Sequence, residues 1–218
     1  MHYPKVSILL GTVCLLALPA NLIILAGQGD LLTGAYTAHN RDVEVVQEGG
    51  ERFIRLSETP GDGAAWLEDV EFTTGTIELD IRGKNKPGQS FVGVTFHSAD
   101  HETYEAVYFR PFNFRSPDPD RQSHSVQYIC HPEYTWHSLR SSRPGEFENS
   151  ISPPPEAEAW LHARIVVEDS SIRVYVNGSS EPSLAVDRLT DRNTGRIGVW
   201  AGHNSAGDFK SFEIHAGP

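Results

Sequence analysis

Beyond residue 30, apolar and polar side chains alternate with a period of two along most of the chain. Residues 76–82 show the pattern most clearly, with apolar side chains at every second position, as in a strand with one buried face. Similar runs occur at residues 43–46, 52–56, 91–96, 104–112, 123–130, 161–167, 172–176, 195–201 and 209–214. The pairs Gly49-Gly50 and Asn177-Gly178 accept positive φ angles and favour tight hairpins. The pattern predicts about ten to twelve strands and no convincing amphipathic helix.

Many short strands joined by polar turns are typical of sandwiches and barrels. We predict an all-β domain, a two-sheet antiparallel jelly-roll sandwich, over residues 28–218. Residues 113–158 interrupt the pattern, because they are rich in proline, serine, arginine and aromatic residues. A loop this long in a compact domain is usually functional or disordered. Its Tyr134, Trp136 and Phe147 argue against disorder.

The first 27 residues differ from the rest. A short, weakly basic start is followed by an almost wholly apolar stretch, residues 6–26. This arrangement predicts a secretory signal peptide or, alternatively, a retained N-terminal membrane anchor. Both interpretations predict a secreted or periplasmic domain, tethered to the membrane only if the segment is kept. Removal of the segment would take Cys14 with it and leave Cys130 without an intrachain partner, so we expect Cys130 to be a buried apolar side chain.

The formal net charge of −11 bears on the choice of partner. An acidic domain repels phosphate backbones, so nucleic acid is excluded as an expected partner. The charge suits a protein that handles neutral or cationic ligands. The sequence gives no indication of oligomeric state.

Strand alternation predicts a candidate binding face. If Val94, Val107 and Val199 point into the core, the side chains next to them point outward. The predicted outer face then carries Thr95, His97, Tyr108, Arg110, Gln127 and Trp200, and the long loop adds Asn113 and Trp136. Aromatic rings beside planar polar groups suit a sugar, because the ring covers the C–H face while the polar groups bind hydroxyls. The alternative is a covered face with packed aromatics and one paired arginine.

Three stretches, residues 75–82, 159–178 and 194–202, carry a family resemblance. Together they resemble the concanavalin A-like lectin/glucanase superfamily, close to laminin-G-like and 3-keto-disaccharide-hydrolase-like (DUF1080-like) domains. The resemblance covers roughly residues 31–216 and implies the sandwich fold. The superfamily includes lectins, carbohydrate-binding modules, glycosidases and adhesion modules, so the fold alone does not decide the function. We expect an exported carbohydrate-binding domain, and the alternatives are a glycoside-cleaving enzyme and a protein-adhesion module.

No catalytic residue can be assigned from the sequence. Glu78 and Asp80 share a strand face, but Lys84 replaces the third acid that the resemblance to family-16-like glucanases would require. A different enzyme would need a titratable pair, drawn from His97, Glu105, Arg110 and His124. Because Glu105 lies on the Val107 face, it is expected to point away from Arg110.

No metal site is predicted, and no cofactor is expected apart from calcium. The histidines lack the H-x-x-x-H spacing of a helical zinc site. The resemblance makes calcium an option, since relatives often bind it, and Asp118 and Asp120 could supply oxygens. The alternative for Pro117-Asp118-Pro119-Asp120 is a rigid turn.

Overall fold

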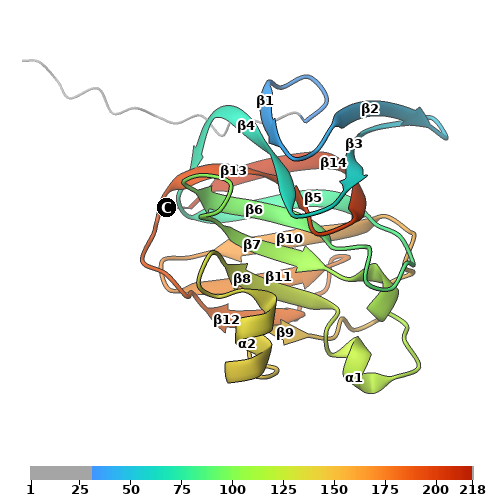
Figure 1. The fold of residues 1–218 in the computed structure, drawn as a ribbon, viewed down its shortest axis with the longest axis vertical. Coiled ribbons are helices and arrows are strands. Elements are labelled where there is room, and N and C mark those ends of the chain that lie inside the picture. Colours follow the sequence, from blue (N-terminus) through green and yellow to red (C-terminus); the bar gives the residue numbers. More distant parts are fainter. Residues whose placement is uncertain (1–30, 218) are drawn as a thin grey trace, which may run out of the picture.

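The structure is a computed structural model that describes residues 31–217, so the predicted export segment lies outside the described residues. Its strands form two antiparallel sheets packed as two layers (Figure 1). The first, called here the front sheet, has the strand order β1 (Tyr36–His39), β4 (Gly63–Phe72), β13 (Gly195–Ala201), β6 (Val92–Ser98), β7 (Glu105–Phe109), β8 (Val126–Cys130) and β9 (Glu148–Asn149). The back sheet has the order β12 (Leu184–Asp187), β11 (Ser171–Val176), β10 (Leu161–Val167), β5 (Gly75–Arg82), β14 (Ser205–Ala216), β3 (Glu51–Thr59) and β2 (Val43–Glu48).

This architecture confirms the predicted all-β, two-sheet sandwich. Each of the predicted alternating runs contributes to a strand, although the run at residues 104–112 ends earlier, because β7 stops at Phe109 and Pro111 opens a 3-10 helix, η1 (Pro111–Asn113). Proline has no backbone N–H to donate to a strand neighbour, which explains the early end. None of the helices of residues 31–217 is long and apolar enough to cross a bilayer.

Strand β4 was missed for a physical reason. Its first five residues, Gly63 to Leu67, are all buried, so both faces of the strand are covered and the sequence shows an apolar run without alternation. The long loop also holds two short helices that were not predicted, α1 (Pro119–Gln122) and α2 (Trp136–Ser142). Helix α2 begins where the Thr135 side chain accepts a hydrogen bond from the Ser138 backbone N–H, as an N-cap.

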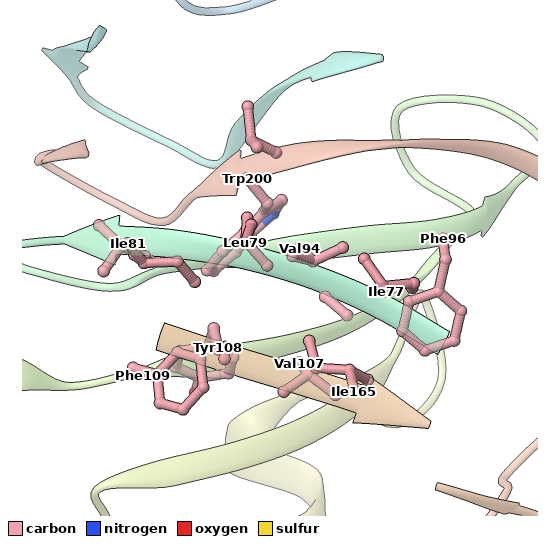
Figure 2. Close-up of a cluster of buried hydrophobic side chains, with 14 of the residues drawn as sticks. Ile77, Leu79, Ile81, Val94, Phe96, Val107, Tyr108, Phe109, Ile165 and Trp200 are labelled. Atoms are coloured by element: carbon pink, nitrogen blue, oxygen red, sulfur yellow. The ribbon is translucent and has the colours of Figure 1, made fainter. Parts of the chain in front are cut away.

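The main core lies between the two sheets. Figure 2 shows Ile77, Leu79, Val94, Val107, Phe109 and Ile165 within the buried cluster. The sheets approach closely near β14, where a Cβ on Gly207 would lie 2.8 Å from Cγ1 of Val92. This contact shows that Val92 points toward the back sheet. By alternation Val94 does the same, and their neighbours Gly93 and Thr95 lie on the other face of the front sheet.

The outer face of the front sheet is covered, which corrects the prediction that it is exposed. Trp200 is only 4% exposed and Tyr108 2%. The covering material is the long loop: Figure 1 shows α2 lying beside β8 and β9, and Leu139 of α2 is 1% exposed. The segment that broke the strand pattern therefore folds over the sheet and leaves a cleft.

Candidate functional site

The floor of the cleft is a row of side chains across the front sheet. Trp200 on β13 is paired with Gly93 on β6, which is paired with Tyr108 on β7. Because Gly93 has no side chain, the two rings meet over it, with centroids 5.2 Å apart. A Cβ at Gly93 would lie 2.8 Å from the Tyr108 Cβ. The glycine therefore allows the aromatic floor to form, and any larger residue would part the rings.

Arg110 follows β7 directly and is held in place on several sides. Its Nη1 donates to the His124 carbonyl (2.9 Å) and lies 3.4 Å from Glu148 Oε2. Its Nη2 donates to the Tyr108 hydroxyl (2.5 Å) and to Gln127 Oε1. Burial lowers the pKa of Arg110, while the Glu148 charge opposes that change. A guanidinium fixed in this way presents its plane at little entropic cost to a ligand.

The wall beside Arg110 comes from the long loop. Trp136, the first residue of α2, is 48% exposed, and Arg140 lies one turn later with its guanidinium 5.4 Å from the indole centroid. Arg140 holds Glu148 with two hydrogen bonds of 2.9 and 2.6 Å. Burial opposes ionisation of Glu148, but the hydrogen bond from Arg140 and the nearby arginine charges outweigh it and lower the pKa. The Trp136 ring in this wall thus packs against the guanidinium of Arg140, which is itself fixed by its ion pair with Glu148.

The opposite end of the cleft carries different chemistry. Asp62, in the turn between β3 and β4, accepts a 3.3 Å hydrogen bond from the Tyr104 hydroxyl. The Tyr104 ring stacks on His131, with centroids 4.7 Å apart. Burial lowers the pKa of His131, and the Asp62 carboxylate opposes this shift. His203 completes this end, and its Nδ1 accepts a hydrogen bond from the Gly61 backbone N–H.

Together these groups enclose a cleft of about 760 Å³, within the range of small-ligand sites. Its lining includes the aromatic side chains of Phe91, Tyr108, Phe112, Trp136 and Trp200, and the polar or charged side chains of Asp62, Arg110, Asn113, Arg121, His124, His131, Thr135, Arg140 and His203. The cleft combines apolar surface with hydrogen-bond donors and acceptors.

Five of the eight predicted binding residues lie in this lining. These five are Tyr108, Arg110, Asn113, Trp136 and Trp200. Gln127 lies just behind them, since its Oε1 accepts hydrogen bonds from Tyr108 and Arg110. Thr95 is buried and bonds Ser98 and the Glu105 carbonyl instead. The structure therefore places five of the predicted residues in one cleft, and their role in ligand binding stays a prediction.

His97 was expected on the same outer face, and that expectation was wrong. His97 has a φ of 47°, and the pairing of β6 with β13 shifts there by one residue. This bulge breaks the alternation and turns the ring to Glu105, 2.7 Å away. Glu105 in turn is bound by Arg188 and Tyr128, away from Arg110 as expected.

Several cleft residues were missed by the sequence analysis. Asp62 and His203 lie in turns far apart in sequence, and no local pattern connects them. Arg140 offered a signal, because it lies four residues after Trp136 and so shares its helix face. Because helix α2 was not predicted, this spacing was not recognised as placing Arg140 beside Trp136.

A comparison with protein-family models identifies the chain. Residues 29–215 match the model of the family described as the 3-keto-alpha-glucoside-1,2-lyase-like domain. The chain belongs to this family. The resemblance drawn from the sequence is thereby confirmed. Among curated proteins, none matches this sequence.

Solved structures resemble this chain in fold. The carbohydrate binding module CBM66 from Bacillus subtilis has a TM-score of 0.61 at 13% identity, covering 85% of this chain and 98% of that one. The VIP36 exoplasmic/lumenal domain, in a Ca²⁺/Man3GlcNAc-bound form, has a TM-score of 0.53 at 11% identity, covering 84% of each chain. A glycosyl hydrolase family protein from Mycobacterium fortuitum has a TM-score of 0.50 at 12% identity, covering 88% of this chain and 99% of that one. Identities this low establish the shared sandwich fold alone.

The paired carboxylates Glu78 and Asp80 lie away from the cleft. Glu78 and Asp80 are on β5 in the back sheet, and His162 on β10 lies between them, 3.3 and 3.0 Å from the two side chains. They share one strand face, as predicted, and form a partly exposed charged ladder. The glucanase arrangement therefore has no counterpart in the cleft.

Residues 31–217 contain no group of three or more His, Cys, Asp or Glu side chains placed to hold a metal ion. At the calcium candidate, Asp118 Oδ1 accepts a hydrogen bond from the Asp120 backbone N–H and caps α1. The residues at this turn therefore fit a helix cap better than a calcium site.

Proposed function

We propose that this domain binds a carbohydrate in the cleft between Trp136 and Asp62. The observation that carries the proposal is the joining of an exposed indole, a buried aromatic floor and fixed guanidinium groups in one cleft of about 760 Å³. Support also comes from the fold, which this chain shares with a carbohydrate binding module and with the glycan-bound domain of VIP36.

The chemistry divides between the two ends of the cleft. The Trp136 ring covers the C–H face of a sugar ring. Arg140 uses Nε and Nη2 on Glu148, which leaves Nη1 to donate to a sugar hydroxyl. Asp62 accepts hydroxyl hydrogen bonds at the opposite end. Donors at one end and an acceptor at the other give the bound sugar a direction.

A second candidate function is glycoside cleavage in the same cleft. The family match favours it, since the family description names a lyase acting on a 3-keto-alpha-glucoside. Such an elimination needs a base to remove a proton made acidic by the neighbouring ketone. His131 suits that role, because burial lowers its pKa and so keeps the imidazole neutral near pH 7.

A two-stage experiment separates these functions. A glycan array with the domain covering residues 28–218, followed by calorimetry on the hits, measures binding, and the same hits and a 3-keto-glucoside are then assayed for released sugar. Binding without release supports the binding domain. Release that is lost in His131→Gln supports the enzyme. No binding and no release would leave the protein-adhesion module as the remaining function.

We further propose that the domain is exported by residues 1–27. The support is the basic start followed by an apolar stretch. The membrane is a partner only if this segment is retained as an anchor. After expression in bacteria, mass spectrometry should place the N-terminus near residue 21 or residue 27. An intact Met1 in a soluble cytosolic product would contradict export.

A further inference from the structure

Arg41 lies in the link between β1 and β2, outside the cleft lining, and is 6% exposed. Its guanidinium donates to four backbone carbonyls. Nη1 donates to Asn40 O at 2.5 Å, and Nη2 donates to Gly61 O at 2.8 Å, Ala201 O at 2.8 Å and Gly202 O at 2.7 Å. Within residues 31–217 it has no carboxylate at ion-pair distance. Three separate turns of the chain thus converge on one buried cation.

The surroundings make room for this side chain. A Cβ at Gly63 would lie 2.8 Å from Arg41 Cγ, 2.9 Å from its Nη1 and 2.7 Å from the His39 carbonyl. A substitution at Gly63 would therefore push the guanidinium off its carbonyls. Asn40 supports the same turn, because its Nδ2 donates to Pro60 O (2.9 Å) and Asp62 O (3.0 Å).

The turns that Arg41 joins carry cleft residues. Gly61 precedes Asp62, and Gly202 precedes His203, and both side chains line the cleft. A direct hydrogen bond of 2.9 Å from the Gly61 N–H to His203 Nδ1 links the two turns on the cleft side. Asp62 and His203 are themselves exposed. Arg41 joins the same two turns through the carbonyls of Gly61 and Gly202.

A buried charge with no carboxylate partner is costly unless dipoles replace its hydration shell. Four carbonyl oxygens supply those dipoles here, in the manner of oxygen ligands around a metal ion. Burial lowers the pKa of Arg41, and the Asp62 charge opposes that change. The carbonyls of these turns therefore stabilise the buried charge, and the guanidinium links the turns to one another.

We propose that Arg41 is a positioning residue of the cleft, an internal cation that fixes the two turns carrying Asp62 and His203. The affinity part of this inference rests on the proposed carbohydrate function, and the structural part does not. Removal of the cation frees the acceptor end of the cleft while the aromatic floor stays in place.

The test compares Arg41→Ala with Arg41→Lys, and Arg52→Ala, an exposed arginine on β3, is the control. Hydrogen exchange is followed by mass spectrometry at residues 58–64 and 200–206, and glycan affinity by calorimetry. We expect Arg41→Ala to exchange faster in both turns and to bind the glycan about tenfold more weakly, through lost preorganisation. Low millimolar guanidinium should restore both properties, whereas sodium chloride at the same ionic strength should not.

Each outcome is decisive for one claim. Unchanged exchange in both turns of Arg41→Ala would overturn the positioning role, and so would a failure of guanidinium to slow the exchange. If Arg41→Ala does not fold, Arg41→Lys and Gly63→Ala are measured instead, and both should loosen the same two turns. A wild-type protein that binds no glycan would contradict the proposed function, while the exchange result still tests Arg41.

Discussion

Two buried polar clusters of nearly the same composition lie on opposite faces of the front sheet. The cleft cluster consists of Tyr108, Arg110, His124, Gln127, Arg140 and Glu148. The inner cluster lies between the sheets and consists of His97, Glu105, Tyr128 and Arg188. Each pairs arginine with glutamate and adds histidine and tyrosine. Strand β7 separates them by alternation, since Tyr108 faces the cleft and Glu105 faces the core.

The inner cluster is closed. Both nitrogens of His97 have partners, Glu105 at 2.7 Å and the Thr73 carbonyl at 2.5 Å. Glu105 also accepts from the Tyr128 hydroxyl (2.5 Å) and from Arg188 Nη2 (2.8 Å). Burial opposes ionisation of Glu105, but these hydrogen bonds outweigh it and lower its pKa. None of these four residues is in the lining of the cleft described above, and their hydrogen-bond partners are other residues of the protein.

The cleft cluster is open on one side. Tyr108, Arg110, His124 and Arg140 line the cleft. One of its buried nitrogens, Gln127 Nε2, has no hydrogen-bond partner among the described residues, whereas His124 Nδ1 lies 3.0 Å from Glu148 Oε1. The same kinds of residue therefore serve two purposes, and enclosure distinguishes them. A closed network contributes stability, whereas an open one holds groups ready for a ligand.

The largest expected effect is on the inner cluster. Glu105→Gln keeps the shape of the side chain but leaves Arg188 as a buried charge without its counterion. Breaking such a pair costs roughly 3–5 kcal/mol. Urea unfolding should show this loss, and glycan affinity of the folded protein should be unchanged. The matched control is Glu146→Gln, in the exposed pair with Arg143, which should leave stability unaltered. Reduced affinity in Glu105→Gln would mean that the two clusters are coupled.

The matched change in the cleft cluster should act on both properties. Glu148→Gln removes the charge that Arg140 and Arg110 share. We expect a smaller stability loss, about 1.5–3 kcal/mol for hydrogen bonds to a charged group, since Arg140 can turn to water. Glycan affinity should fall about tenfold, because both guanidinium groups lose their orientation. Calorimetry and urea unfolding on the same samples check this. A loss of stability with unchanged affinity would mean that Glu148, like the inner cluster, contributes to stability alone.

Trp136 should affect binding alone. Its indole is 48% exposed, so Trp136→Ala should change stability by no more than about 0.5 kcal/mol. Affinity should fall by about 1–3 kcal/mol, the scale of an aromatic anchor at a binding site. His137→Ala, at the exposed neighbouring position outside the cleft lining, is the control. Equal glycan affinities of Trp136→Ala and His137→Ala would mean that Trp136 does not contribute to binding.

The smallest expected effect is a pH dependence from the cleft histidines. Burial lowers the pKa of His131 and of His124 in the folded state, whereas an unfolded histidine titrates near about 6.5. Protons therefore bind the unfolded state more tightly, so stability is complete above about pH 6.5 and declines as the pH falls from there toward the folded pKa. The free energy of unfolding should therefore drop as the pH falls below about 6.5. His131→Gln should reduce the drop, and His137→Gln should not. An equal drop in all three proteins would contradict this assignment.

The sequence predicted the sandwich because alternation reports burial on one face, as in residues 76–82. It could not report the cover over the outer face, since a loop of mixed composition carries no period. Residues such as Tyr108 and Trp200 were therefore assigned to the correct face but to the wrong environment. His97 failed differently, because a bulge reverses side-chain direction without a sequence signal. Asp62 and His203 meet only through folding, with Arg41 beneath them.

The central claim is that a glycan binds between Trp136 and the floor formed by Trp200 and Tyr108. The protein has four tryptophans, and their indole N–H signals can be resolved by NMR and assigned with Trp→Phe variants. Trp160 packs on Phe53 in the back sheet, and Trp66 lies under Arg196 near the sheet edge. Titration with the best glycan from the array should shift the Trp136 and Trp200 signals and leave Trp66 and Trp160 in place. Shifts of Trp66 or Trp160, with Trp136 and Trp200 unmoved, would contradict the account.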